Sequence, residues 1–476
     1  MAVALWHSPA VAQAPAQAPV ANVWSLEDCI RMALAHNKTI QAAYLDRVVQ
    51  KFDLRVAEDK FTPKMLLSPS VSRVQSGSTS NGLTTSSRVT AAGVAATVNQ
   101  AVATGAQITL GGAQNTLRQV GVDSTQAYGW SIAVVQPLLK GGGFDVARSS
   151  VLAAQLVERN NILALKSTLT DTLIAVTTAY RNYYKSLKSL EINRQSVERA
   201  RELLGINRVL IATGRMAEVD IVQSEADVAS QEFNLLAAEN TTDGARLELV
   251  RLLDLDINTR ITPQLTFAVE PIAYELESAK DLAYANRPDY QSLLLGIEVA
   301  KIRLMLAKNN QLPDLSASLG YGRDTVSSAT PATAGMSGGW SMGLKLTIPL
   351  GDMTIKQGLV AASIDMEKNE LNLVKQRDSI AIEVQNALRN VEMSFRQVTL
   401  AQRARALSEK KVSIETEKLK AGRSTNFQIV SYQNDLVNAQ NNELTTTIAY
   451  LDTMTALDRT LGIALEKWGV SLQAKP

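Results

Sequence analysis

The stretch Trp130-Ser-Ile-Ala-Val-Val-Gln-Pro-Leu138 returns later in the chain as Trp340-Ser-Met-Gly-Leu-Lys-Leu-Thr-Ile-Pro-Leu350. Both stretches begin with Trp-Ser, end at Pro-Leu and are followed by glycine, either directly or three residues later. Alternation of residue types predicts a β-strand, and a proline, which cannot donate to a sheet ladder, indicates where each strand ends. The repeated stretch therefore predicts that the chain consists of two related halves.

The sequence around these stretches repeats in the same order. Residues 41–70 match residues 291–320, with a lysine ten residues after the first glutamine and a proline near the end. A long helical run follows each strand region, and its apolar residues step by four, three, four and three. These residues are Val176, Tyr180, Tyr183, Leu187 and Leu190 in the first half, and Val384, Leu388, Val391, Phe395 and Val398 in the second. A period of 3.5 residues predicts a coiled-coil seam.

The repeats define the predicted domain organisation. The first structural repeat covers residues 25–257, with helices over 25–61, 144–213 and 216–254, and the second covers 275–465. A linker over 258–274 joins them, and residues 466–476 form a C-terminal tail. Residues 1–24 contain Ala12-Gln-Ala14, which fits either the remnant of a secretory leader or a disordered tail. The helix over 144–213 would be about 100 Å long, so it must pack against other long helices.

The strand candidates are typical of an outer-membrane barrel, in which segments of about ten alternating residues are joined by polar loops. They cover residues 65–75, 87–100, 107–115, 128–136, 315–323 and 341–348. Trp130 and Trp340 are either part of an interfacial aromatic belt or ordinary strand residues. Four to six strands cannot close a barrel, so closure requires several chains; whether 87–115 joins the barrel stays open. No run of 18 uninterrupted apolar residues occurs, which predicts that no helix spans a membrane.

Composition excludes several other classes of function. Of 476 residues, 48 are Lys or Arg and 46 are Asp or Glu, so the net charge of +2 indicates no nucleic-acid partner. The one cysteine, Cys29, follows Asp28, which favours a buried helix residue over a lipid anchor. The only histidines are His7 and His36, and no Cys/His cluster, metal site or cofactor motif is present. We therefore predict no cofactor and no enzymatic activity.

Taken together, these features resemble the TolC-like outer-membrane efflux proteins, over about residues 25–465. The resemblance rests on the paired proline-bounded strands, on Gln136-Pro-Leu-Leu-Lys-Gly-Gly142, and on the turns at 213–220 and 421–428. It implies an α+β membrane protein, a homotrimer whose α-helical barrel in the periplasm is continuous with an outer-membrane β-barrel. Such a protein contacts outer-membrane lipid and is a passive export duct for a tripartite efflux pump or a type I secretion system. Its partners would be a periplasmic adaptor protein and an inner-membrane pump.

The resemblance also implies functional residues at the two helical turns. The tips that contact the adaptor would be Thr213, Gly214 and Arg215, together with Ala421, Gly422 and Arg423. The pore constriction would lie at Asp220, Gln428 and Ser431. This chain departs from the family pattern, because well-studied members carry acids at the positions of Gln428 and Ser431.

A second class of protein also fits part of the sequence. A periplasmic coiled-coil scaffold or adaptor without a channel would account for the helical seams. It would not account for two sets of strands bracketed by prolines. The sequence does not identify the exported substrate, and it does not separate drug efflux from secretion.

Overall fold

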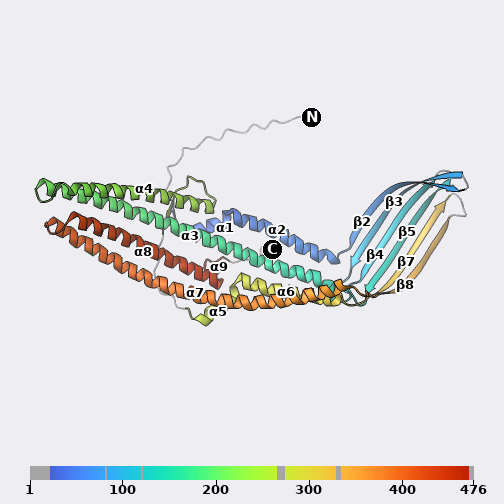
Figure 1. Cartoon of the computed structure of the whole chain (residues 1–476). Helices are drawn as coiled ribbons and strands as arrows, with labels where there is room; N and C mark the ends of the chain where they lie inside the picture. The colour runs from blue at the N-terminus through green and yellow to red at the C-terminus, as the bar shows by residue number, and fades with distance from the viewer. Residues whose placement is uncertain (1–21, 81–82, 120–121, 265–273, 329–333, 471–476) are drawn as a thin grey trace, which may run out of the picture. The chain divides into compact units, whose positions relative to one another are not determined.

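The computed structural model describes residues 22–80, 83–119, 122–264, 274–328 and 334–470 (Figure 1). The chain divides into two compact units, and each draws segments from both predicted halves. One unit contains residues up to Tyr44, Lys166–Arg287 and the chain from Ser379 onward; the other contains Leu45–Leu165 and Pro288–Asp378. The predicted leader lies almost wholly outside the described residues, as do 265–273 of the predicted linker and 471–476 of the tail.

The second unit contains one antiparallel sheet of six strands in the order β2-β3-β4-β5-β7-β8 (Figure 1). The strands are β2 (Lys64–Ser80), β3 (Leu83–Ala101), β4 (Gln107–Gln119), β5 (Val122–Pro137), β7 (Asp314–Ser328) and β8 (Gly335–Thr347). All six predicted strands are present, and β3 and β4 belong to the same sheet as the others. Most strands extend further toward the loops than predicted, because the Ser- and Thr-rich ends pair in register, as at Ser76 and Ser87.

Helices flank the strands in the order that the duplication predicts, helix, strands, long helix, helix. The first half contains α1 (Leu26–His36), α2 (Lys38–Glu58), a 3-10 turn η1 (Asp59–Phe61), α3 (Phe144–Ala212) and α4 (Asp220–Leu253). The second half contains α5 (Leu276–Asn286), α6 (Pro288–Asn309), α7 (Met353–Lys420), α8 (Asn426–Leu461) and α9 (Ala464–Lys467). The predicted fold class is confirmed in this order of elements.

Two predicted helix boundaries are wrong. The helix predicted over 25–61 is interrupted at Asn37, whose backbone is extended and whose side chain donates to Leu252 O at 2.8 Å. Its amide oxygen accepts from the backbone N–H of Thr39 at 2.9 Å, so the side chain replaces a helical bond. The helix predicted from 216 begins at Asp220, because residues 216–219 offer no side chain that caps a helix, and Val219 makes no capping bond.

The core of the first unit contains a two-stranded parallel ribbon that the sequence did not predict. It pairs β1 (Asn22–Trp24) with β6 (Ile261–Pro263). The Tyr180 hydroxyl lies 2.8 Å from the carbonyl oxygens of both Trp24 and Gln264, and the Tyr183 hydroxyl donates to Ile261 O at 2.9 Å. Burial raises the pKa of both hydroxyls, which keeps them protonated as donors.

The predicted seams are buried. Val176, Tyr180, Tyr183 and Leu190 on α3, and Val384, Val391 and Val398 on α7, have buried side chains. Leu187, Leu388 and Phe395 are half-buried, and the Phe395 ring lies 5.9 Å from that of Tyr450 on α8. Cys29 is also fully buried, as predicted. The period of 3.5 residues therefore marks the faces on which the long helices pack.

The sequence predicted that no helix is apolar enough to span a membrane. Helix α3 nevertheless contains one window that is apolar enough to cross a membrane, judged by length and composition only. Of that window, 39% is buried inside the protein. A single helix of this kind is weak evidence for a membrane span, because core helices of soluble proteins pass the same test.

We expect an aspartate on either seam to prevent folding of the helical unit. Tyr183→Asp or Val391→Asp places a carboxylate where the side chain is buried, at a cost on the order of 3 kcal/mol or more. The measurement is the yield of folded, detergent-extracted protein by size-exclusion chromatography, together with its helical melting curve by circular dichroism.

The sequence offers a matched control beside each seam residue. Asn182 and Asn390 are exposed on the same helices, so Asn182→Asp and Asn390→Asp add the same charge one residue away. We expect both control variants to melt as the wild-type protein does. Equal losses at seam and control positions would mean that the seams do not hold the unit together.

Candidate functional site

The two faces of the six-stranded sheet differ in chemistry. Pairing register places alternate residues of neighbouring strands on one face, and one face carries the large apolar side chains. These include Met65, Leu67, Val71, Val94, Val98, Ile108, Leu110, Trp130, Ile132, Leu319, Tyr321, Trp340, Met342, Leu344 and Leu346. The opposite face carries mainly small or polar residues, among them Ser68, Ser70, Thr97, Asn99, Thr109, Asn115, Ser131, Ser316, Ser318, Asp324, Ser341 and Lys345. We call these the apolar face and the polar face.

Aromatic rings gather on the apolar face. The Tyr321 ring lies 5.4 Å from that of Trp130 and 4.7 Å from that of Trp340. Trp340, Met342 and Leu344 are 75–86% exposed, although large apolar side chains are normally covered. A face this apolar and this exposed needs an apolar environment, which either lipid or another protein would supply.

The two predicted tips have the same backbone geometry, and both lie in the first unit. Gly214 (φ 70°) and Gly422 (φ 73°) adopt the left-handed conformation that favours glycine. The N–H of Arg215 bonds to Leu210 O at 2.8 Å, and the N–H of Arg423 bonds to Lys418 O at 2.8 Å. Each tip therefore ends its long helix in a Schellman motif, which accounts for the repeated Gly-Arg pair in the sequence.

The residues that follow the two tips make different contacts. After Gly422, the Thr425 side chain caps α8 by accepting from the N–H of Gln428, at 3.3 Å. The Ser424 hydroxyl donates to Glu415 at 2.7 Å, and this bond and Lys418 lower the pKa of the Glu415 carboxyl. The first tip has no such cap, and its Arg215 side chain lies 3.5 Å from Lys420 O at the other tip. The two tips therefore adjoin each other.

A buried cluster lies beneath the tips and was not predicted. Asn207 on α3 is fully buried, and its side-chain NH2 lies 2.7 Å from Ser224 Oγ on α4 and 2.7 Å from Asn426 Oδ1 on α8. The Asn426 amide in turn donates to Gln223 Oε1 at 3.3 Å. Apolar side chains of Leu203, Leu210, Leu419 and Ile429 pack nearby as one core cluster. The available signal was an asparagine four residues after Leu203 and three before Leu210, on the buried face of α3.

A second layer of amide contacts lies further along the same helices. Gln231 on α4 accepts from the Ser196 hydroxyl on α3 at 2.9 Å and donates to Asn434 Oδ1 on α8 at 3.0 Å. Gln231 also donates to Asp227, whose carboxyl pKa is raised by burial. Helix α4 is therefore joined to α8 by neutral amides at two levels.

The predicted constriction residues lie in the first turns after the tips. Asp220 is the first residue of α4, and its carbonyl oxygen lies 3.5 Å from the Asn426 amide nitrogen. Gln428 and Ser431 lie in the first two turns of α8, and all three side chains are half-buried. Within the described part of the chain, the Asp220 carboxylate forms no ion pair.

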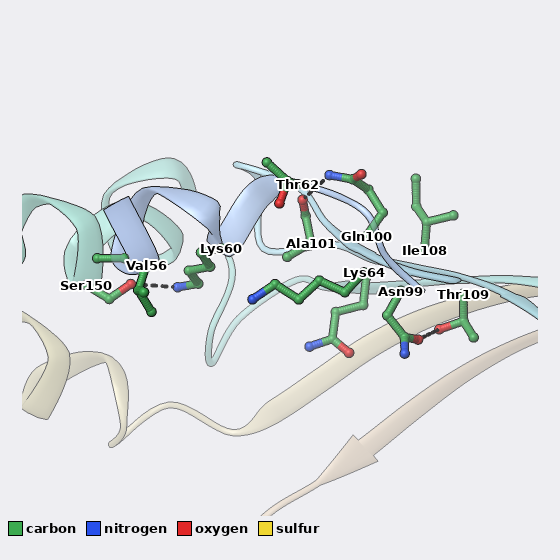
Figure 2. A pocket seen from close by; sticks show the side chains of 12 residues that line it. Val56, Lys60, Thr62, Lys64, Asn99, Gln100, Ala101, Ile108, Thr109 and Ser150 are labelled. Atoms are coloured by element: carbon green, nitrogen blue, oxygen red, sulfur yellow. Dashed lines mark hydrogen bonds between the residues drawn. The ribbon is translucent and has the colours of Figure 1, made fainter. Parts of the chain in front are cut away.

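An open pocket lies where the strands β2, β3 and β4 begin or end, in the second unit (Figure 2). Its basic side chains already have partners: Lys60 donates to Ala147 O at 2.7 Å and to Ser150 Oγ at 2.9 Å, and Lys64 pairs with Asp59 at 3.3 Å. The Thr109 hydroxyl donates to Asn99 at 3.0 Å. These bonds join η1 and α3 to the end of the sheet. Among the described residues, no group of three or more His, Cys, Asp or Glu side chains could hold a metal ion.

Known proteins with this arrangement are outer-membrane channels. Residues 280–463 match the family model described as outer membrane efflux protein. The alkaline protease secretion protein AprF of Pseudomonas aeruginosa is 23% identical over 227 residues, which is 47% of this chain and 46% of that relative. The chain thus matches less than half the length of this curated relative.

The chain has the fold of solved outer membrane channels. The CmeC outer membrane channel of Campylobacter jejuni has a TM-score of 0.69 at 15% identity, over 92% of this chain and 86% of that one. The MtrE outer membrane channel of Neisseria gonorrhoeae, in its open state, has a TM-score of 0.67 at 17% identity, over 92% of this chain and 89% of that one. The efflux-protein fold thus covers nearly the whole chain.

We expect the buried Asn207 cluster to hold the two tips closed against local opening. Asn426→Ala leaves the Asn207 amide with one partner fewer, at a cost of about 1–3 kcal/mol. Trypsin cleavage after Arg215 and Arg423 should then accelerate roughly tenfold, because cleavage requires the tip to open. The measurement is the initial cleavage rate at each arginine by mass spectrometry.

Asn438→Ala is the matched control, since Asn438 is exposed on the same helix. Its cleavage rates should equal those of the wild-type protein. If Asn426→Ala cleaves no faster than this control, the cluster does not restrain the tips.

Proposed function

We propose that this protein is a subunit of a passive export channel in the bacterial outer membrane. We also propose that it has no enzymatic activity. Three copies would contribute their sheets to one β-barrel in the membrane, and their long helices would form an α-helical barrel in the periplasm. The observation that carries the proposal is the six-stranded sheet with one apolar face and one polar face. A lipid-facing barrel with a wet lumen requires that division of the side chains.

The free edges of the sheet support assembly. Strands β2 and β8 each pair with one neighbour only, so one side of each strand has no partner strand among the described residues. Lipid offers no hydrogen bonds, so a membrane barrel must pair every edge, and a second copy can pair its β2 with this β8. The alternative, a periplasmic scaffold or adaptor, gives no reason for the exposed apolar face.

The partners follow from this role. A passive duct needs an energy source, and we propose an inner-membrane pump joined through a periplasmic adaptor protein. The adaptor would contact the two tips, at Thr213, Gly214 and Arg215 and at Ala421, Gly422 and Arg423. Their exposure and their adjacency within one copy support this assignment.

We expect the protein to leave the outer-membrane fraction only in detergent, and to run as a trimer. Reconstituted in planar lipid bilayers, it should give discrete conductance steps, because the polar face would line a water-filled lumen. The measurements are membrane fractionation, light scattering in detergent and single-channel recording. A folded monomer that is soluble without detergent would refute the proposal.

We further propose that the mouth of the channel is narrowed at Asp220, Gln428 and Ser431. Asp220→Ala should raise the single-channel conductance, because it removes the carboxylate that would hold α4 to a neighbouring helix in the closed mouth. Gln428→Asp should create three symmetry-related carboxylates that bind divalent cations and block the current at micromolar to millimolar concentrations. Both effects are measured by bilayer recording with and without added Mg²⁺ or Ca²⁺.

Asn438→Asp is the control for the second variant, because it adds the same charge to α8 three turns further on. It should show no cation block. Unchanged conductance for Asp220→Ala, together with no block for Gln428→Asp, would place the constriction elsewhere.

A further inference from the structure

Four arginines lie at one end of the apolar face. Arg73 on β2 follows Val71 by two residues, so both lie on that face, and pairing register adds Arg88, Arg118 and Arg323. Arg73, Arg88 and Arg118 lie toward the end of the sheet where β2 joins β3, and Arg323 lies five residues before the end of β7. We call these four residues the arginine belt.

The belt carries charge that the described part of the chain does not neutralise. All four side chains are exposed, and none forms an ion pair among the described residues. Arg88 donates to Gln75 at 3.3 Å, and Arg323 contacts the Met336 sulfur. No Asp or Glu lies on the apolar face within the described residues of the strands; Asp324 lies on the polar face. Solvated arginines normally alternate with acids, so a face with arginine alone indicates an anionic partner.

On β2 and β7, an arginine of the belt comes directly after the last apolar side chain of the apolar face. On β2 the last apolar side chain before the belt is Val71, and on β7 it is Tyr321. Along the pairing register, Tyr321 is level with Met65, six residues below Val71. Arg323 is level with Leu67 along the pairing register, so it is also displaced by six residues from Arg73. Strands that tilt by about 45° in a barrel produce this shift, and it brings Arg323 toward the height of Arg73.

We propose that the arginine belt binds the phosphate groups of anionic lipid headgroups in the leaflet on the loop side of the membrane. The proposal rests on the proposed function, because it takes the apolar face to be the lipid-facing one. A guanidinium group matches a phosphate with two parallel hydrogen bonds, which an ammonium group cannot do. The rings of Tyr128 and Trp130 lie on the same face near the belt, where interfacial aromatic residues are expected. The belt thereby fixes the height of the barrel in the membrane.

The test compares lipid binding by the detergent-extracted protein. The probe is a phosphorylated glycolipid, lipid A, and its counterpart is the same glycolipid with its phosphates removed. The triple variant Arg73→Gln, Arg118→Gln, Arg323→Gln should bind the phosphorylated lipid on the order of a hundredfold more weakly, since each basic side chain near an anionic surface contributes about fivefold. The corresponding Arg→Lys triple variant should bind the phosphorylated lipid more weakly than the wild-type protein and more tightly than the Gln triple variant. It keeps the positive charge but loses the paired hydrogen bonds.

Lys345→Gln is the matched control, because Lys345 lies on the polar face of β8. It should bind the phosphorylated lipid as the wild-type protein does. Equal binding of the phosphorylated lipid by the wild type and the Gln triple variant would overturn the proposal. Equal binding of the two lipids by the wild type would also overturn it, and so would displacement of the phosphorylated lipid by millimolar inorganic phosphate. Bilayer recording separates this result from the proposed function: conductance without lipid preference refutes only the belt, and absence of any conductance refutes the channel.

Discussion

The unpaired edges of one sheet constrain most of this structure. Strands β2 and β8 each have one paired side, and the face they share is apolar and exposed along its length. Water could satisfy the backbone groups but not the apolar side chains, whereas lipid could cover the side chains but not the backbone. Both needs are met only when other copies continue the sheet within a membrane. The proposed trimer would complete the sheet in this way.

The helices of the first unit make polar contacts of two kinds. Within the hairpin of α3 and α4, exposed ion pairs such as Arg201 with Glu232 and Arg208 with Glu225 lie on the surface. Between the two hairpins, two contacts pair neutral amides, Asn207 with Asn426 and Gln231 with Asn434, and charged contacts occur as well, such as Arg181 with Asp452. Neutral amides lose less free energy than charges when they leave water, and they still specify which helices meet. The second hairpin is thus held in one register against the first.

Periodicity predicted the parts of this fold that repeat. The seam residues from Val176 to Leu190, the six strands and the glycine at each tip follow from spacing and from the chemistry of proline and glycine. The β1–β6 ribbon could not be predicted, because each strand has only three residues. The ribbon is held in place by hydrogen bonds from the hydroxyls of Tyr180 and Tyr183, which are distant in sequence. The Asn207 cluster was missed for a similar reason, since it joins residues 17 and 219 positions apart. The assigned mouth residues come from resemblance, and their roles depend on neighbouring copies.

Close approach across strands explains why the polar face contains so many glycines. A Cβ added to Gly93 would lie 2.0 Å from Asn115 Oδ1, and one added to Gly129 would lie 2.1 Å from Asp324 Oδ1. These two glycines leave room for a polar side chain of the next strand to lie flat along the sheet. Side chains that lie flat do not project into the space that the polar face encloses, so a barrel built from this face keeps a wide lumen. A wide and weakly charged lumen would suit the proposed export duct, which conducts without binding its cargo.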